Sequence, residues 1–144
     1  MLWLEKSEIS VNDKVLFTLQ KSHKYTILAK LFKSRNFDYE FKMELLKKIT
    51  GDDNSDIAIN TRAKCMAGLP DAALKAKTWA EITDLNSKDS LYLKNAKIAG
   101  FYSWDQLDII SPYFDKYYEV LPVLNQGTTY KYMSSFFYTL LPTM

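Results

Sequence analysis

Histidine and cysteine are nearly absent from this sequence of 144 residues, which contains one His (His23) and one Cys (Cys65). A structural zinc site or a disulfide framework needs several such side chains close together. One of each can form neither, so we expect no metal-ligating residue and no cofactor site within this chain. We expect His23 to be a surface or capping residue, and Cys65 to be a small buried apolar one.

Glycine and proline are also scarce, with four of each in the whole chain. Such a shortage of turn-forming residues disfavours a Gly-rich β-sandwich or barrel, and 47% hydrophobic residues disfavour a disordered chain. The composition predicts one helical domain that spans residues 1–144.

Arginine is also scarce, because Arg35 and Arg62 are the two arginines among the 19 basic residues. The sequence contains 17 acidic residues. A net charge of +2 gives no strong field for phosphate backbones or an anionic membrane, so we expect neither nucleic acid nor membrane as a partner. The apolar start, residues 1–4, is interrupted at Glu5 before a signal peptide or membrane span is complete. With a single Cys, this predicts a cytoplasmic location.

Apolar residues spaced three and four apart predict seven or eight helices in short antiparallel pairs. The resulting fold is all-α, an irregular superhelix of helix pairs of the armadillo or HEAT kind. Ser111-Pro112 either kinks the longest helix or starts a new one with Ser111 as its N-cap, and we favour the kink. The predicted helical ranges are 11–37 with a break at Ser22-His23, 38–49, 55–69, 72–83, 91–101, 103–124 and 130–141.

Acidic residues in two places have spacings that suggest chemistry. Residues 52–56 alternate like a calcium loop, but Ile57 stands where that loop needs Gly, and Ala63 where it needs a bidentate Glu. Glu40 and Glu44 lie one helical turn apart, as two glycosidase carboxylates could, yet a position early in a helix explains them through the helix dipole. We interpret both groups as capping and turn residues, so the sequence offers no catalytic residue.

Aromatic residues are concentrated in the last third of the chain. Core packing accounts for most of them, but the number exceeds what one face of each helix needs. We therefore expect an apolar face there that another domain or a peptide covers, with Trp104, Tyr113 and Tyr117 as its leading candidates.

A set of spaced residues in the second half of the chain resembles a known family. The residues that carry the resemblance are Pro70 to Lys75, Trp79, Asn95-Ala96, Gly100-Phe101, Gln106, Pro112-Tyr113-Phe114, Tyr117 and Leu121-Pro122. Together they resemble the C-terminal helical domain of the aminopeptidase N family of zinc metallopeptidases, the type found at the end of the endoplasmic-reticulum aminopeptidases. The match is clear over residues 55–142.

The resemblance implies an all-α superhelix that packs over a catalytic domain and closes a cavity around a peptide substrate. In that family the catalytic domain binds zinc through H-E-x-x-H and a downstream Glu, and G-x-M-x-N is the exopeptidase motif. Neither motif occurs in this sequence, so no catalytic or zinc-binding residue is carried over. The resemblance thus identifies the chain as the C-terminal piece of a larger enzyme, with zinc and peptide bound by the intact protein.

The family-motif residues are expected to have packing roles. Lys75 and Trp79 stand one turn apart on a helix and would form a stacked pair over the Pro70 turn. Gly100 would allow a close helix end, with Phe101 as an aromatic plug.

Three functional hypotheses follow. The first is a non-catalytic domain of a zinc aminopeptidase that shapes the substrate cavity and has the catalytic domain of the same polypeptide as its partner. The second is a free-standing helical-repeat adaptor that binds another protein through the aromatic surface. The third and weakest is a stand-alone enzyme.

Overall fold

The computed structural model describes residues 4, 7–12 and 14–141, and the chain is 71% helical. The all-α class with seven or eight helices is confirmed, because eight α-helices lie in the described residues beside one two-stranded sheet. No helix among these residues is long and apolar enough to cross a membrane. The bounds are β1 Glu8–Val11, β2 Lys14–Thr18, α2 Lys21–Lys33, α3 Tyr39–Thr50, α4 Asp56–Gly68, α5 Ala72–Thr83, α6 Leu91–Phe101, the 3₁₀ turn η1 Trp104–Gln106, α7 Leu107–Ile110, α8 Pro112–Gly127 and α9 Tyr130–Leu140.

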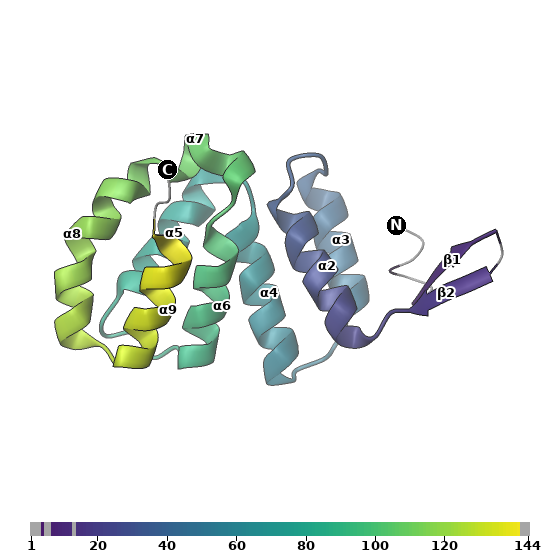
Figure 1. The fold of residues 1–144 in the computed structure, drawn as a ribbon, viewed down its shortest axis with the longest axis horizontal. Helices are drawn as coiled ribbons and strands as arrows, with labels where there is room; N and C mark the ends of the chain where they lie inside the picture. Colours follow the sequence, from purple (N-terminus) through teal and green to yellow (C-terminus); the bar gives the residue numbers. More distant parts are fainter. Residues whose placement is uncertain (1–3, 5–6, 13, 142–144) are drawn as a thin grey trace.

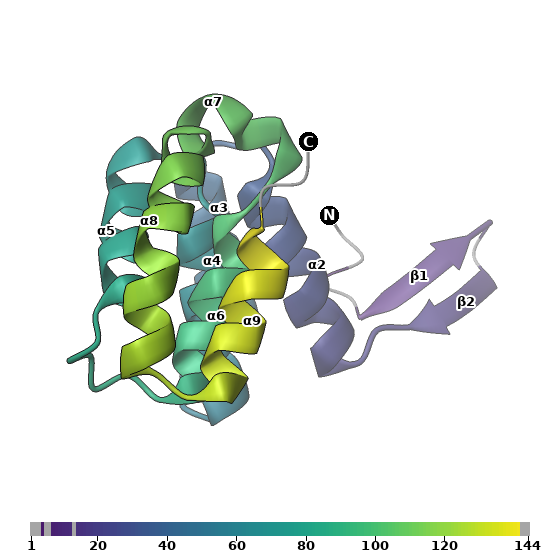
Figure 2. The ribbon, with the colours of Figure 1, turned by 60° about the vertical axis from the view of Figure 1, so that its left-hand side comes forward.

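The helices form an irregular superhelix of antiparallel pairs (Figures 1 and 2). In one layer α2, α4, α6 and α9 lie side by side. In the other layer α3, α5 and α8 return in the opposite direction. As a result, the C-terminal ends of α2, α4 and α6 all lie at the same end of the molecule, where their unpaired carbonyl groups need hydrogen-bond donors.

Capping side chains fix where most of the helices begin. In each case the side-chain oxygen accepts a hydrogen bond from a backbone N–H in the first helical turn. Predicted helix ranges 38–49, 55–69, 72–83, 91–101 and 130–141 are confirmed to within one residue. The caps are Asp38, Ser55, Asp71, Ser90 and Thr129.

The predicted helix at the start of the range 11–37 is wrong, because β1 and β2 form an antiparallel hairpin there. Val15, Leu16 and Leu19 have helical spacing, but Val15 and Leu16 belong to an exposed strand and Leu19 is buried at the base of the hairpin. Asn12 adopts a left-handed backbone conformation with φ of 49°, which Asn tolerates in a turn. The hairpin projects from the end of the helical layers (Figure 1).

The predicted break at Ser22-His23 is also wrong, because both residues lie in the first turn of α2. Gln20 is the N-cap, and its backbone N–H donates to Nδ1 of His23 at 3.2 Å. Helix α2 therefore begins at the place where Ser22-His23 predicted a break between two helices. The expectation that His23 is a surface or capping residue is confirmed.

The favoured kink at Ser111-Pro112 is wrong as well, since α7 ends at Ile110 and a separate helix begins at Pro112. Proline fits the first position of a helix because it has no N–H to leave unpaired there. The alternative is confirmed, because Ser111 is the N-cap of α8 and Pro112 stands in its first turn, although the side chain of Ser111 makes no capping hydrogen bond.

Two hydrophobic clusters fill the space between the layers, and α4 and α6 pack closely between them. The first cluster, around α2, α3 and α4, includes Leu28, Phe32, Leu45, Leu46 and Cys65. The second, around α5 to α9, includes Ile82, Ile98, Phe101, Ile110, Tyr117, Tyr132 and Phe136.

Candidate functional site

The family-motif residues meet at the junction between α4, α5 and α6. Gly100 lies against α4 so closely that a Cβ atom there would stand 2.3 Å from the carbonyl oxygen of Lys64 and 2.8 Å from Cβ of Ala67. No side chain fits that space, which explains a glycine at this helix end. Phe101 is 3% exposed, so the predicted close helix end with an aromatic plug is confirmed.

Lys75 is fully buried and joins the ends of two helices. Its Nζ donates to the carbonyl oxygens of Ala67 at 2.7 Å and Phe101 at 2.6 Å, near the ends of α4 and α6. Burial, followed by the nearby charge of Lys33, lowers the pKa of Lys75 to about 7. A neutral amine has two N–H groups, which matches the two carbonyls.

The expected stacking of Lys75 on Trp79 is wrong, because the Lys75 Nζ lies 5.2 Å from the ring centroid of Phe101 instead. The ring of Trp79 packs against Phe101, Tyr113 and Phe136, with centroid distances of 5.7, 5.2 and 6.0 Å. The ring of Phe101 thus contacts both the amine of Lys75 and the indole of Trp79.

Two more side chains, which sequence reasoning did not single out for this role, extend the junction to α2. Gln106 Nε2 donates to the carbonyls of Lys33 at 2.6 Å and Gly68 at 2.9 Å. The Lys33 Nζ donates to the carbonyls of Ala99 at 2.9 Å and Tyr102 at 2.7 Å. We call Lys33, Lys75 and Gln106 the helix-end cluster. A basic residue in the last turn of a helix was the available signal for Lys33, but nothing in the sequence showed which helix it would reach.

The Pro70 turn connects this junction to α5. Pro70 is half-buried between α4 and α5, and the next residue, Asp71, caps α5 through a 2.8 Å hydrogen bond from the Leu74 N–H. The cap sets the direction of α5 and thereby aims both Lys75 and Trp79 into the junction.

The three residues expected to form an outward aromatic face are not brought together at the surface. Trp104 is 63% exposed and packs against Tyr102, whereas Tyr113 is half-buried beside Trp79. Tyr117 is 1% exposed and stacks on Phe136, so its ring belongs to the core of this chain. A role of Trp104 and Tyr113 in contacting another domain stays a prediction.

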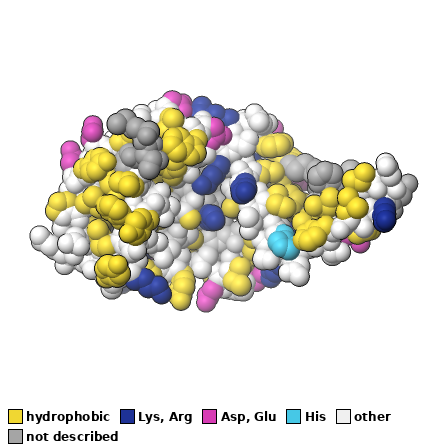
Figure 3. Space-filling view, viewed as in Figure 1, with side chains coloured by type: hydrophobic (Ala, Val, Ile, Leu, Met, Phe, Trp, Pro, Cys, Tyr) yellow, Lys and Arg dark blue, Asp and Glu magenta, His cyan; other side chains and the backbone are white. Residues whose placement is uncertain are grey.

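Exposed aromatic side chains instead gather on α8 and α9, at the end of the molecule opposite the hairpin (Figure 3). Tyr130 is 88% and Tyr138 77% exposed. Together with Met133 and Phe137 they line a shallow hollow of about 220 Å³. We call these four residues the α9 surface.

The remaining candidates for chemistry have structural roles. Cys65 is completely buried, and burial raises the pKa of its thiol to about 12, so it is not a nucleophile at neutral pH. Asp53 accepts from the hydroxyl of Tyr25 at 3.0 Å and pairs with Lys21, and Ser55 caps α4. In the described part of the chain no group of three or more His, Cys, Asp or Glu side chains is placed to hold a metal ion.

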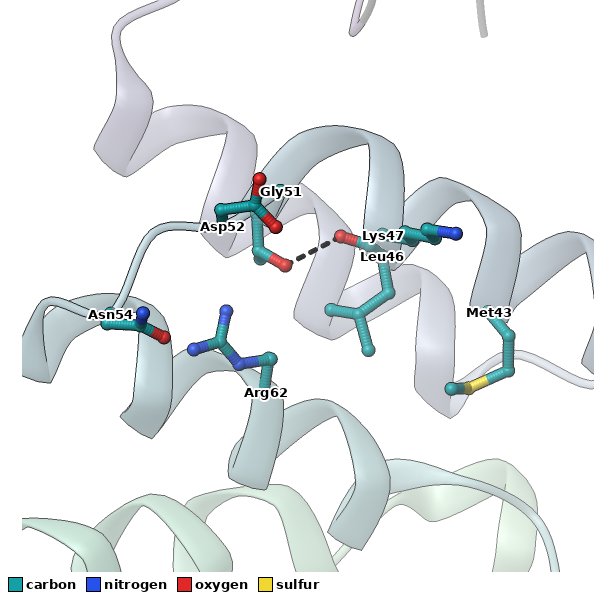
Figure 4. Close-up of a pocket in the computed structure, with 8 residues that line it drawn as sticks. Met43, Leu46, Lys47, Gly51, Asp52, Asn54 and Arg62 are labelled. Atoms are coloured by element: carbon teal, nitrogen blue, oxygen red, sulfur yellow. Dashed lines mark hydrogen bonds between the residues drawn. The ribbon is translucent and has the colours of Figure 1, made fainter.

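A hollow of about 460 Å³ lies between α3 and α4 (Figure 4). Apolar side chains from α3 form one wall, and polar side chains from the connecting loop and α4 form the other. We call it the α3–α4 hollow. Its lining consists of Met43, Leu46, Lys47, Thr50, Gly51, Asp52, Asn54 and Arg62.

Comparison with known proteins gives no assignment, since no protein-family model matches the chain and no curated protein matches it significantly.

Proposed function

We propose that this chain is a non-catalytic helical domain of a zinc aminopeptidase, an enzyme that removes N-terminal residues from peptides. In this proposal the domain packs over the catalytic domain of the same polypeptide and closes the substrate cavity. Zinc and the reacting groups belong to that catalytic domain.

The observation that carries the proposal is the convergence of the motif residues. Lys75 and Phe101 are 26 positions apart in the sequence, yet the amine of Lys75 donates to the backbone carbonyl of Phe101 and lies near its ring. The indole of Trp79 packs against the same ring. A set of residues that carries a family resemblance by chance would have no reason to meet at one junction. This supports the view that the pattern encodes a particular helical architecture.

The roles of the titratable side chains agree with a domain that supplies shape. Lys75 is committed to two helix-end carbonyls, Cys65 is buried, and His23 caps α2. A domain of this kind would contribute a rigid wall, and the exposed Trp104 next to the junction is the residue most suitable for contacting a catalytic domain.

The decisive experiment concerns the native reading frame and the activity of its product. We expect the frame to continue upstream into H-E-x-x-H, and its whole product to hydrolyse an aminoacyl fluorogenic substrate in a zinc-dependent way. Trp104→Ala should reduce turnover or raise KM there, whereas Tyr92→Ala, an equally exposed aromatic change, should not. A frame with no such motif would refute the proposal. So would robust hydrolysis by residues 1–144 alone, which would favour a stand-alone enzyme.

The second candidate function is a helical-repeat adaptor, and the α9 surface is the observation that favours it. Four apolar or aromatic side chains around a shallow hollow resemble the apolar centre of many protein interfaces. If the chain is an adaptor, Tyr130→Ser and Tyr138→Ser should abolish partner binding without lowering stability. Under the aminopeptidase proposal, the same changes should instead alter the activity of the whole enzyme or have no effect.

A further inference from the structure

Two cationic side chains line the α3–α4 hollow, and most of their donor groups are unused. Arg62 Nη2 donates to the backbone carbonyl of Asp53 at 2.8 Å, and this is the hydrogen bond that the guanidinium makes within the described residues. The ammonium group of Lys47, on the last turn of α3, makes neither an ion pair nor a hydrogen bond with the described residues. Figure 4 shows Arg62 rising from α4 toward α3, between Asn54 and Leu46. A guanidinium has five N–H donors, so several remain available to a ligand.

The acidic residues nearby do not neutralise both cations. The carboxylate of Asp53 is paired with Lys21 and bonded to Tyr25, and these contacts with the Ser55 cap hold its pKa well below its usual range. Asp52 is the acidic residue among those that line the hollow. With two cations against one acid, the lining carries a net charge of +1, which a single carboxylate neutralises.

The other wall of the hollow is apolar. Leu46 is 5% exposed, and Met43 lies one turn before it on the same face of α3. Methionine adapts its shape to different apolar groups. The volume of about 460 Å³ is in the range of small-ligand sites.

We propose that the α3–α4 hollow binds a monocarboxylate that carries an apolar group. The carboxylate contacts Arg62, because an arginine fork matches the two oxygens of a carboxylate, and Lys47 adds positive charge at the rim of the hollow. The apolar group packs against Met43 and Leu46. This site lies away from the helix-end cluster and the α9 surface, and the proposal does not depend on the aminopeptidase assignment.

Two sources of such a ligand share this chemistry: a free aliphatic acid and the C-terminal residue of a peptide. The probes are hexanoate for the first and acetyl-Ala-Ala-Leu with a free carboxyl group for the second. Hexanamide and the amidated tripeptide are the uncharged controls. Binding is followed by the backbone amide NMR shifts of residues 46, 51 and 62 in the whole chain. We expect at least one of the two acids to shift these signals, and its amide to do so at least tenfold more weakly; the tighter of the two acids identifies the source.

Variants locate the binding to the two cations. Arg62→Met should weaken the acid about tenfold or more, as loss of a charge-assisted hydrogen bond does. Lys47→Met tests the same site at an exposed residue whose loss should not disturb folding. Arg35→Met is the matched control, because the guanidinium of Arg35 pairs with Asp108 elsewhere. The proposal is overturned if neither acid shifts these signals, if the amides bind equally well, or if Arg62→Met and Lys47→Met bind as the unchanged chain does.

Discussion

Lys75 gives this protein a dependence of stability on pH that one substitution should remove. Burial lowers the pKa of the folded-state amine from 10.5 to about 7. Between these two values the unfolded chain binds more protons than the folded one, so the free energy of unfolding must rise as the pH rises. Below pH 7 both states are protonated, and the cost of burying the charge is fully present.

The expected magnitude follows from the two pKa values. Proton linkage with a folded value of about 7 and an unfolded value of 10.5 gives a gain of about 2 kcal/mol in unfolding free energy from pH 7 to pH 9. Lys33 and Lys42, whose pKa values burial also lowers, add slopes of the same sign. The effect of Lys75 is therefore the difference between the unchanged protein and Lys75→Met.

Urea denaturation at pH 7, 8 and 9 measures this difference. The stability gap between the unchanged chain and Lys75→Met should widen by about 2 kcal/mol over this interval, in favour of the unchanged chain. Lys77→Met, on an exposed position of the same helix, should leave the pH slope as it is. A gap that stays constant, or narrows toward pH 9, would show that the two carbonyls hold Lys75 in its charged form and would refute the reasoning.

Three other predictions concern buried groups. Gly100→Ala should destabilise the fold by about 2–3 kcal/mol, because its Cβ meets a backbone carbonyl of α4 at 2.3 Å. Gly68→Ala meets Cγ of Lys33 at 3.1 Å, which requires only a small shift, so it should cost less in the same urea assay. Cys65 should react with a thiol reagent only after unfolding, and rapid labelling of the native protein at pH 8 would contradict its burial. Tyr132→Phe should lower stability by about 1–2 kcal/mol through loss of its hydrogen bond to a carbonyl of α5, and Tyr92→Phe, at an exposed ring, is the control that should show no loss.

Much of the fold could be predicted because local signals and packing agree along most of the chain. At α3, for example, the cap Asp38, the apolar stripe and the terminating Gly51 all specify the same helix. The same agreement fails before α2. Val15 and Leu16 satisfy a helical spacing by coincidence, while the turn at Asn12 and three consecutive apolar residues favour strands. Pairing with β1 decides between the two, and that is a tertiary effect.

The helix-end cluster shows what a single sequence could not supply. Gly100 and Phe101 could be predicted as a close helix end because their residue types have few other uses there. The aromatic ring that the Lys75 amine contacts could not be predicted, because Trp79 and Phe101 are both candidates. The choice between them depends on how α6 packs against α5. Gln106 was noticed as part of a pattern, but its two acceptors come from α2 and α4.

The hydrogen bonds of the helix-end cluster also link the stability of helix pairs that are not neighbours in the array. In a simple helical array each pair contacts its neighbours, so stability is a sum of local interfaces. Here Lys33, on α2, donates to two carbonyls at the end of α6, two helices further along the same layer, and Gln106 returns to the ends of α2 and α4. Separating any one of these ends leaves buried carbonyls of the others without donors, at a cost of about 1–3 kcal/mol each. The first and second hydrophobic clusters are therefore coupled through polar groups at this end of the array.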